Sequence, residues 1–304
     1  MPGQLKKNKK SEMLNKPSIV FFGGEPLGLP SLKALCNAGL KPALVVCNPD
    51  RPSGRGQQLQ ISPIKAWAEE NGLTIFQPET FKERDQLTAI TERDWDLFVV
   101  VAYNFILPRW FLEIPNHGVL NVHPSLLPKL RGASPIRSAI LHNERDSIGV
   151  SVMLMDEKMD HGPILKQEVV SIADAQWPIS GPELDDVLAT LGGAMLAETI
   201  PVWLAGLLSP VEQEHDAATY THKFTKADSE LFLDPTTLPD KEAAFTMLCK
   251  IRAFAGMFDT YFVDNGKRIK IKEATLSQDG SLVLLRVTPE GKKETDFDSY
   301  LQLR

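Results

Sequence analysis

Short apolar runs alternate with helical patterns along the first half of the chain. The apolar runs cover residues 18–22, 42–47, 73–76 and 96–102, and the helical patterns between them cover residues 30–38, 63–71 and 83–91. Parallel strands need a crossover connection, which is usually a helix, so this alternation is typical of a parallel sheet. The sequence therefore predicts an α/β fold with a doubly wound, mostly parallel sheet.

A further apolar run, residues 118–122, contains Asn121 and is followed directly by His123. Residues i and i+2 of a strand share one face, so these two polar side chains point the same way. In open α/β sheets, ligands bind at the carboxyl ends of the strands. We therefore expect the Asn121 amide and the His123 ring to lie together at a ligand-binding edge.

Asp160 is expected in a turn between alternating runs at 148–154 and 164–172, and it joins the other two side chains if that turn folds back over the strand end. An amide, an imidazole and a carboxylate in one pocket suit acyl transfer to an amine. The amide and the protonated imidazole donate to an oxyanion, the imidazole exchanges protons, and the carboxylate orients the imidazole. Taken singly, each residue is equally typical of a structural role in a strand end or a turn.

Two motifs resemble those of the folate-dependent formyltransferases. They are Asn121-Val-His123-Pro-Ser-Leu-Leu-Pro-Lys-Leu-Arg-Gly-Ala-Ser-Pro-Ile136 and Met155-Asp-Glu-Lys-Met-Asp160-His-Gly162. The resemblance implies a Rossmann-like core and transfer of a formyl group from 10-formyltetrahydrofolate to the α-amino group of an aminoacyl-tRNA. Asn121, His123 and Asp160 match the catalytic positions of the family, which needs no metal.

The resemblance also implies folate contacts beyond two strand ends. The residues concerned are Ser125, Leu126, Leu127, Pro128, Tyr103 and Asn104. Family members commonly carry glycine where Asn104 stands, and asparagine tolerates the left-handed backbone conformation. They often carry a small hydroxyl residue where His161 stands, and we expect His161 to face solvent. Ordinary core packing explains residues 103–108 equally well.

Residues 48–63 form a polar loop, rich in glycine and proline, that is longer than the usual connection in an α/β unit. The loop resembles the insertion with which family members that act on initiator methionyl-tRNA grip the acceptor arm. On this resemblance, Arg51 and Arg55 contact tRNA phosphates. A surface loop with incidental arginines is the alternative.

The net charge of −6 argues against a general affinity for nucleic acid, so a tRNA substrate requires basic residues on one face. Lys223 and Lys226 lie in a basic segment that resembles the interdomain region of the family. In residues 267–272, the spacing places Arg268 and Lys270 on one strand face, opposite a face of isoleucines. A basic face suits RNA phosphates, and an ordinary edge strand protected by lysine is the alternative.

Four parts are expected along the chain. They are a disordered basic tail at residues 1–16, a catalytic domain at 17–206, a linker at 207–228 and a small tRNA-binding domain at 229–304. The resemblance implies that the small domain is β-barrel-like, of the OB type, in shortened form. It weakens where Ala255-Gly-Met257 replaces the usual turn of the family.

Other protein classes are disfavoured by what the sequence contains. There is no apolar run of about 18 residues or more and no secretory pattern, so a cytoplasmic protein without a membrane span is expected. The glycine-rich loop at residues 23–28 lacks the spacing of nicotinamide-binding loops. Scattered cysteines suit a reducing compartment and give no zinc spacing; they are Cys36, Cys47 and Cys249.

The resemblance predicts formylation of initiator methionyl-tRNA for translation initiation, by a monomer. Formylation of an amino-sugar nucleotide or another small amine would keep the same chemistry with a different acceptor. A non-catalytic RNA-binding or folate-sensing protein is a third alternative, against which the intact set of Asn121, His123 and Asp160 argues.

Overall fold

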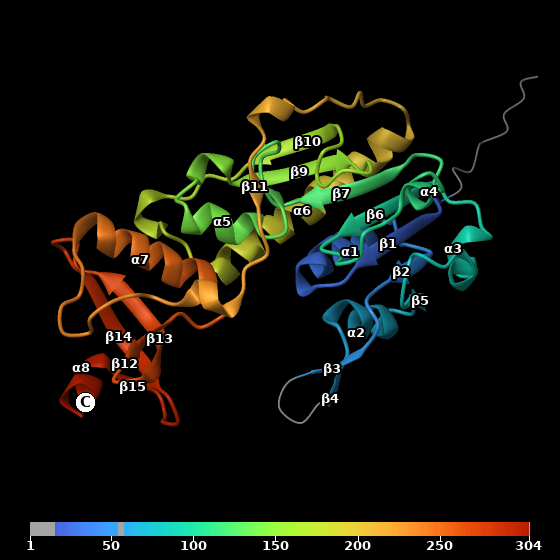
Figure 1. Cartoon of the computed structure of the whole chain (residues 1–304). Coiled ribbons are helices and arrows are strands. Elements are labelled where there is room, and N and C mark those ends of the chain that lie inside the picture. The colour runs from blue at the N-terminus through green and yellow to red at the C-terminus, as the bar shows by residue number, and fades with distance from the viewer. Residues whose placement is uncertain (1–15, 54–57, 304) are drawn as a thin grey trace, which may run out of the picture.

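A seven-stranded sheet forms the centre of the expected catalytic domain, with strand order β10-β9-β7-β6-β1-β2-β5 (Figure 1). This computed structural model describes residues 16–53 and 58–303, so nearly all of the expected basic tail lies outside the described residues. The strands are β1 (Ile19–Gly23), β2 (Leu44–Val46), β5 (Ile75–Phe76), β6 (Leu97–Val101), β7 (Val119–His123), β9 (Gly149–Leu154) and β10 (Ile164–Val169). The neighbouring strands β5, β2, β1, β6 and β7 pair in parallel, while β9 pairs antiparallel with both β7 and β10. This arrangement confirms the predicted mostly parallel sheet.

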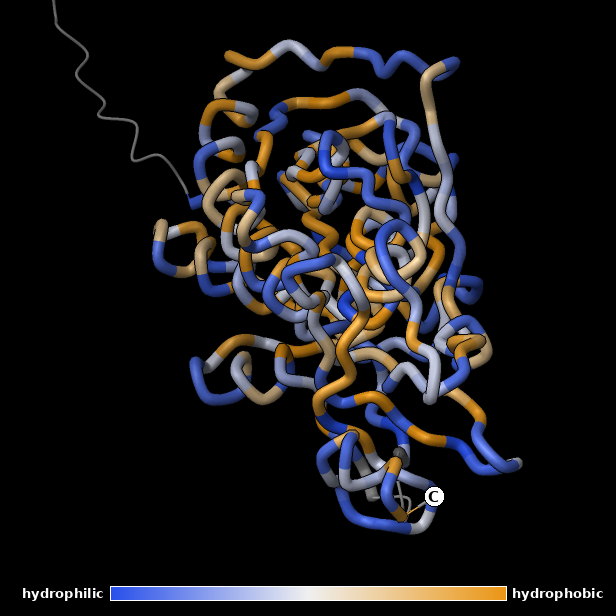
Figure 2. The backbone as a smooth tube through the Cα atoms, turned by 90° about the vertical axis from the view of Figure 1, so that its left-hand side faces the viewer, coloured by the Kyte–Doolittle hydropathy of each residue, from blue (hydrophilic) through white to orange (hydrophobic). Residues whose placement is uncertain are grey.

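Each face of the sheet is covered by helices because the strands are apolar on both sides. In β1, Ile19 and Phe21 pack into one core and Val20 and Phe22 into the other, as a period of two requires. The first core is shared with α1 (Leu29–Asn37), α2 (Pro63–Glu70), α5 (Pro135–Leu141) and α6 (Gly181–Leu204). The second is shared with α3 (Thr88–Thr91) and α4 (Arg109–Leu112). Figure 2 shows hydrophobic residues gathered inside and hydrophilic ones in the surrounding loops.

Helix α6 is the longest helix and begins at a capping box formed by Ser180 and Glu183. Its length and apolar composition would suffice to cross a bilayer, a test that core helices also pass. Here it packs on α1 and β9, with Leu184, Leu188 and Leu196 buried. The apolar side chains of α6 therefore contribute to the core of this fold.

The small carboxyl-terminal domain contains an antiparallel sheet of order β12-β13-β14-β15. Its elements are α7 (Lys241–Phe254), β12 (Tyr261–Asp264), β13 (Lys267–Leu276), β14 (Leu282–Pro289), β15 (Thr295–Asp296) and α8 (Phe297–Gln302). The expected barrel-like domain is thus a four-stranded sheet whose edge strands, β12 and β15, are not paired with each other in the described chain. Helix α7 packs on α5, and Ala253 joins the core of the catalytic domain.

The segment expected to be a linker is docked along the catalytic domain. Its strand β11 (Tyr220–Thr221) pairs in parallel with β8 (Arg131–Gly132), and Val211 forms a bridge with Ile164 of β10. Residues 207–228 therefore belong to the scaffold around the sheet as well as joining the two domains. The long polar loop contains a hairpin, β3 (Arg51–Ser53) and β4 (Gln58–Gln60), and Arg55 lies outside the described residues.

Candidate active site

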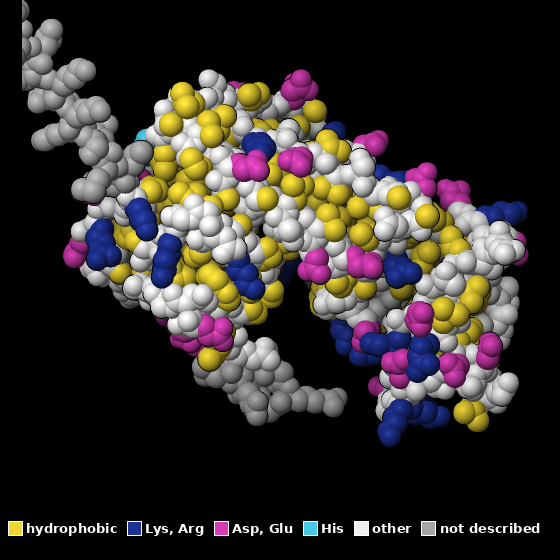
Figure 3. Space-filling model, turned by 180° about the vertical axis from the view of Figure 1, so that it is seen from behind, with side chains coloured by type: hydrophobic (Ala, Val, Ile, Leu, Met, Phe, Trp, Pro, Cys, Tyr) yellow, Lys and Arg dark blue, Asp and Glu magenta, His cyan; other side chains and the backbone are white. Residues whose placement is uncertain are grey.

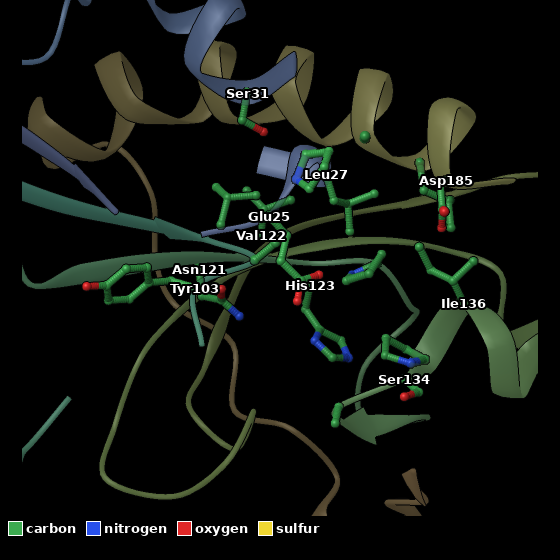
Figure 4. A pocket seen from close by; sticks show the side chains of 18 of the residues that line it. Glu25, Leu27, Ser31, Tyr103, Asn121, Val122, His123, Ser134, Ile136 and Asp185 are labelled. Carbon is green, nitrogen blue, oxygen red and sulfur yellow. The ribbon is translucent and has the colours of Figure 1, made fainter. Parts of the chain in front are cut away.

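A cavity of about 650 Å³ opens at the carboxyl ends of β6 and β7. Asn121 and His123 line it, and Figure 4 shows their side chains projecting to the same side of β7. Asp160, from the turn between β9 and β10, lines the same cavity. The structure therefore brings together the three side chains singled out from the sequence.

His123 is held between two acceptors. Its Nε2 lies 3.0 Å from the carbonyl oxygen of Leu130, and its Nδ1 lies 3.6 Å from Oδ1 of Asp160. A carbonyl oxygen only accepts, so Nε2 carries a proton and Nδ1 is the nitrogen that faces the carboxylate. The distance to Asp160 exceeds that of a hydrogen bond but is close enough for a protonated ring to be stabilised.

Asp160 is positioned by the main chain around it. Its Oδ2 accepts a hydrogen bond of 2.7 Å from the backbone N–H of Gly132 in β8. Its own backbone adopts a φ of 49°, a left-handed conformation that is uncommon outside glycine. The turn is thereby bent so that the carboxylate faces His123.

An aromatic wall closes the cavity on the side of β6. Tyr103 and Phe105 line the cavity and belong to a cluster of rings with Phe22 and Phe81. Burial raises the pKa of the Tyr103 hydroxyl, and that hydroxyl is buried without a partner in the described part of the chain. Tyr103 therefore contributes its ring to the aromatic wall, while its hydroxyl points away from Asn121 and His123 (Figure 4).

Asn104 also lines the cavity, but in a role other than the expected one. Its Nδ2 donates a hydrogen bond of 3.0 Å to Glu25, at the end of β1. The left-handed residue of this segment is Ala102, with a φ of 48°, whose carbonyl accepts from Gly24 and Glu25. The departure from glycine at Asn104 therefore adds a link across the cavity mouth.

The turn from Ser125 to Pro128 does not line the cavity, so the folate contacts expected for Ser125, Leu126, Leu127 and Pro128 stay a prediction. Ser125 is fully buried, and its hydroxyl donates to the carbonyl of Lys129 at 2.6 Å. The N–H of Leu127 donates to the hydroxyl of Ser151. The turn satisfies its own backbone inside the fold, so its side chains support the end of β7 from behind.

Sequence reasoning missed a buried polar pair beneath the Asp160 turn. Arg131, which is 1% exposed, donates to Oε1 of Gln213 through Nε and Nη2 at 3.1 and 2.6 Å. Arg131 was visible as part of the formyltransferase-like motif, but Gln213 stands in a polar segment without any period. His161 lies beside this pair, bonded to Asp156 at 2.6 Å and stacked on His215 with ring centroids 3.9 Å apart.

The described residues that are expected to contact tRNA do not line the cavity. Arg51 pairs with Glu79 on the surface, and Lys223 and Lys226 are exposed. In β13, Arg268 lies over the ring of Tyr261, 4.1 Å from its centroid, and Lys270 pairs with Asp259 at 2.8 Å.

Residues 18–180 match the family described as formyl transferase. The chain is 41% identical over 239 residues to the methionyl-tRNA formyltransferase of Halorhodospira halophila, which covers 78% of this chain and 73% of that one. The chain belongs to the methionyl-tRNA formyltransferase family. Members from Thermodesulfovibrio yellowstonii and Myxococcus xanthus are 36% and 34% identical, over 90% and 95% of this chain and 92% and 96% of theirs. Likeness to this family thus extends beyond the catalytic domain.

Solved structures of formyltransferases share the fold of this family member. The N-formyltransferase from Helicobacter canadensis, in complex with folinic acid and dTDP-3-aminofucose, has a TM-score of 0.60 and 17% identity, covering 90% of this chain and 100% of that one. A 4-N formyltransferase from Francisella tularensis has a TM-score of 0.61 and 18% identity, covering 89% and 97%. These likenesses confirm the predicted fold class.

Proposed function

We propose that this chain transfers the formyl group of 10-formyltetrahydrofolate to the α-amino group of initiator methionyl-tRNA, as a cytoplasmic monomer that serves translation initiation. The observation that carries the proposal is the meeting of Asn121, His123 and Asp160 at the carboxyl end of β7. The names of the full-length relatives support tRNA as the acceptor.

The cavity fits a folate. Its volume of about 650 Å³ is within the range of small-molecule sites, and the aromatic wall of Tyr103 and Phe105 suits a flat pteridine ring. When bound, the folate supplies the formyl group that is transferred.

The side chains divide the chemistry between them. The neutral α-amine attacks the formyl carbon, a new C–N bond forms, and the bond from that carbon to the folate nitrogen breaks. The amide of Asn121 and the protonated Nδ1 of His123 stabilise the negative charge that develops on the formyl oxygen. Because Nε2 is committed to Leu130, Nδ1 is the exchanging atom: it gives its proton to the leaving folate nitrogen and then takes the proton that the amine loses.

Asp160 has two tasks in this scheme. Its carboxylate stabilises the protonated ring of His123 from 3.6 Å, and it offsets the positive charge that forms on the attacking amine. The Gly132 N–H holds the carboxylate in place, so that little reorganisation is needed during the reaction.

The tRNA is proposed to contact basic residues elsewhere in the sequence. These are Arg51, Arg55, Lys223, Lys226, Arg268 and Lys270. Such contacts bind phosphates and place the aminoacyl end at the cavity without a role in the chemical step.

The test is an incubation of the full chain with 10-formyltetrahydrofolate and charged initiator tRNA, followed by detection of formylmethionine. A dTDP-amino sugar serves as the competing acceptor, since structural neighbours carry names of sugar formyltransferases. Formylation of the sugar alone, or of neither acceptor, would overturn the proposal. In addition, Arg55→Ala should raise the KM for tRNA and leave the KM for folate unchanged.

A further inference from the structure

A closed ring of hydrogen bonds passes beneath the Asp160 turn. Nε2 of Gln213 donates to the carbonyl oxygens of Asp160 and Gly162 at 3.0 and 2.7 Å. Oε1 of Gln213 accepts from Arg131, and the next residue, Gly132, donates its N–H to the Asp160 carboxylate. The carbonyl and the carboxylate of Asp160 are thus both held by one hydrogen-bond network.

The Asp160 turn needs such support. A left-handed backbone at a residue other than glycine costs about 1–2 kcal/mol, so the turn relaxes unless other contacts hold it. The Gln213 amide binds the carbonyls on both sides of His161 and so fixes the bend of the turn. Gln213 is 5% exposed, which keeps water from replacing these bonds.

Arg131 fixes the orientation of the Gln213 amide. Its guanidinium donates twice to Oε1, so the NH₂ group of Gln213 must face the turn. Arg131 is itself anchored by Tyr220 at 3.3 Å and by Nδ1 of His215 at 3.0 Å. The pair therefore has one arrangement, in which each donor nitrogen of Arg131 and Gln213 meets an acceptor.

We infer that Gln213 is a positioning residue for the formyl transfer, which holds the Asp160 carboxylate against His123. The inference rests on the proposed function. Gln213 does not line the cavity, so it acts only through Asp160. The segment at residues 207–228, which joins the two domains, thereby also shapes the active site.

The variant Gln213→Glu tests this inference. It keeps the size of the side chain and an acceptor for Arg131, but it places a second oxygen against the carbonyls of Asp160 and Gly162. The turn should shift, and kcat should fall about 10–100-fold, as expected for displacements near 1 Å. Both KM values should stay within about two-fold, because no residue of the cavity is replaced. Gln213→Met, which removes both sets of bonds without repulsion, is measured alongside in case the glutamate impairs folding.

A matched control uses another glutamine with the same kind of bonds. Gln167 donates through Nε2 to the carbonyl of Leu127 and the hydroxyl of Ser151, both at 2.8 Å. Gln167→Glu should leave kcat within about two-fold of the parent, the scatter expected for independent sites. An equal loss of kcat in both variants would overturn the inference.

A double-mutant cycle separates positioning from general support. If Gln213 acts through Asp160, Gln213→Glu should slow the parent but not the Asp160→Ala variant, whose carboxylate is already gone. The same fold loss in both backgrounds would assign Gln213 a merely structural role and overturn the inference. An unchanged rate in Asp160→Ala would also overturn the inference, because Asp160 would then have no role in the transfer, whereas the absence of formyl transfer in the parent would refute the proposed function. Melting temperatures of all variants are measured, so that unfolded protein is not read as slow enzyme.

Discussion

Strands β7 and β13 each carry polar side chains on one face, and these side chains are fixed by different contacts in the two strands. In β7, Asn121 and His123 face a cavity, and the His123 ring is fixed by a buried main-chain carbonyl. In β13, Lys270 and Lys272 share the carboxylate of Asp259, at 2.8 and 2.7 Å. The first array is held inside the fold, and the second is held on the surface by an opposite charge.

The difference shows that catalytic donors and phosphate-binding groups depend on different environments. A catalytic donor must be fixed before the substrate arrives, because reorganisation during the reaction raises the barrier. The proposed phosphate contacts of β13 require only that a lysine is near its ligand, but Lys270 and Lys272 would first have to leave the carboxylate of Asp259. Figure 3 shows acidic side chains beside basic ones on the small domain, which agrees with this competition.

The largest expected effect on kcat comes from replacing Asn121 or His123 in β7. Asn121→Ala and His123→Ala each remove one donor to the developing oxyanion, so kcat should fall about 10²–10³-fold. The KM for tRNA should change little, since neither side chain is proposed to contact phosphates. The measurement is single-turnover formylation at saturating substrates, with Lys270→Ala as the contrasting variant that should raise the KM and spare kcat. Near-parental turnover in Asn121→Ala or His123→Ala would remove the proposed mechanism.

The next comparison is between two glycines, Gly132 beside the active site and Gly266 in the small domain. Gly132 has a φ of 109°, and an added Cβ would lie 2.5 Å from the carbonyl oxygen of Thr221. Gly132→Ala should cost about 1–3 kcal/mol from the backbone and about 1–3 kcal/mol from crowding. It should also lower kcat, because the N–H of Gly132 holds Asp160.

Gly266, in the turn between β12 and β13, is the matched control. Its φ is 73°, and an added Cβ would meet nothing within 4 Å. Gly266→Ala should therefore cost only the conformational term, about 1–2 kcal/mol, and leave kcat unchanged. Urea unfolding of both variants makes the comparison, and equal losses of stability would contradict the role given to the crowding at Gly132.

Local sequence patterns were sufficient to predict the sheet and the edge at which the site lies. The alternation of apolar runs with helices correctly predicted the parallel strands, because the strands β1, β2, β6 and β7 are buried on both faces. The period of two placed Asn121 and His123 together without any knowledge of the fold. Asp160 required the family resemblance, since no local pattern states how far a turn folds back.

Other features depend on contacts between distant residues and were not predictable. Gln213 acts on a turn some 50 residues earlier, and nothing in its own polar segment marks it. The turn from Ser125 to Pro128 looked exposed to a ligand, but its polar groups are satisfied internally, by Lys129 and Ser151. The neutralising partner of Lys270, Asp259, precedes a separate strand and gives no pattern with it.

A smaller effect is expected from releasing the lysines of β13. Asp259→Asn removes a competing carboxylate, so the KM for tRNA should fall a few-fold and its dependence on the logarithm of salt concentration should steepen by about one unit. Asp279→Asn, in the turn between β13 and β14, makes the same change of net charge at a carboxylate bonded to Ser277 and Ser281. If both variants lower the KM equally, net charge and not the release of lysines would be the cause.

The smallest effect concerns the stability of the small domain at low pH. Burial raises the pKa of the Asp259 carboxyl, but the hydrogen bonds from Lys270 and Lys272 outweigh it and leave this pKa below its ordinary value. A carboxyl with a lowered pKa stabilises the folded state above its unfolded pKa of about 3.9 and loses that contribution as the pH falls through the folded pKa. Because the partners are over a third exposed, the contribution should be only about 0.2–1 kcal/mol. The difference in unfolding free energy between the parent and Asp259→Asn should therefore be constant from pH 7 to 5 and shrink below pH 4, whereas a difference that grows on acidification would show that Asp259 is not stabilised by these lysines.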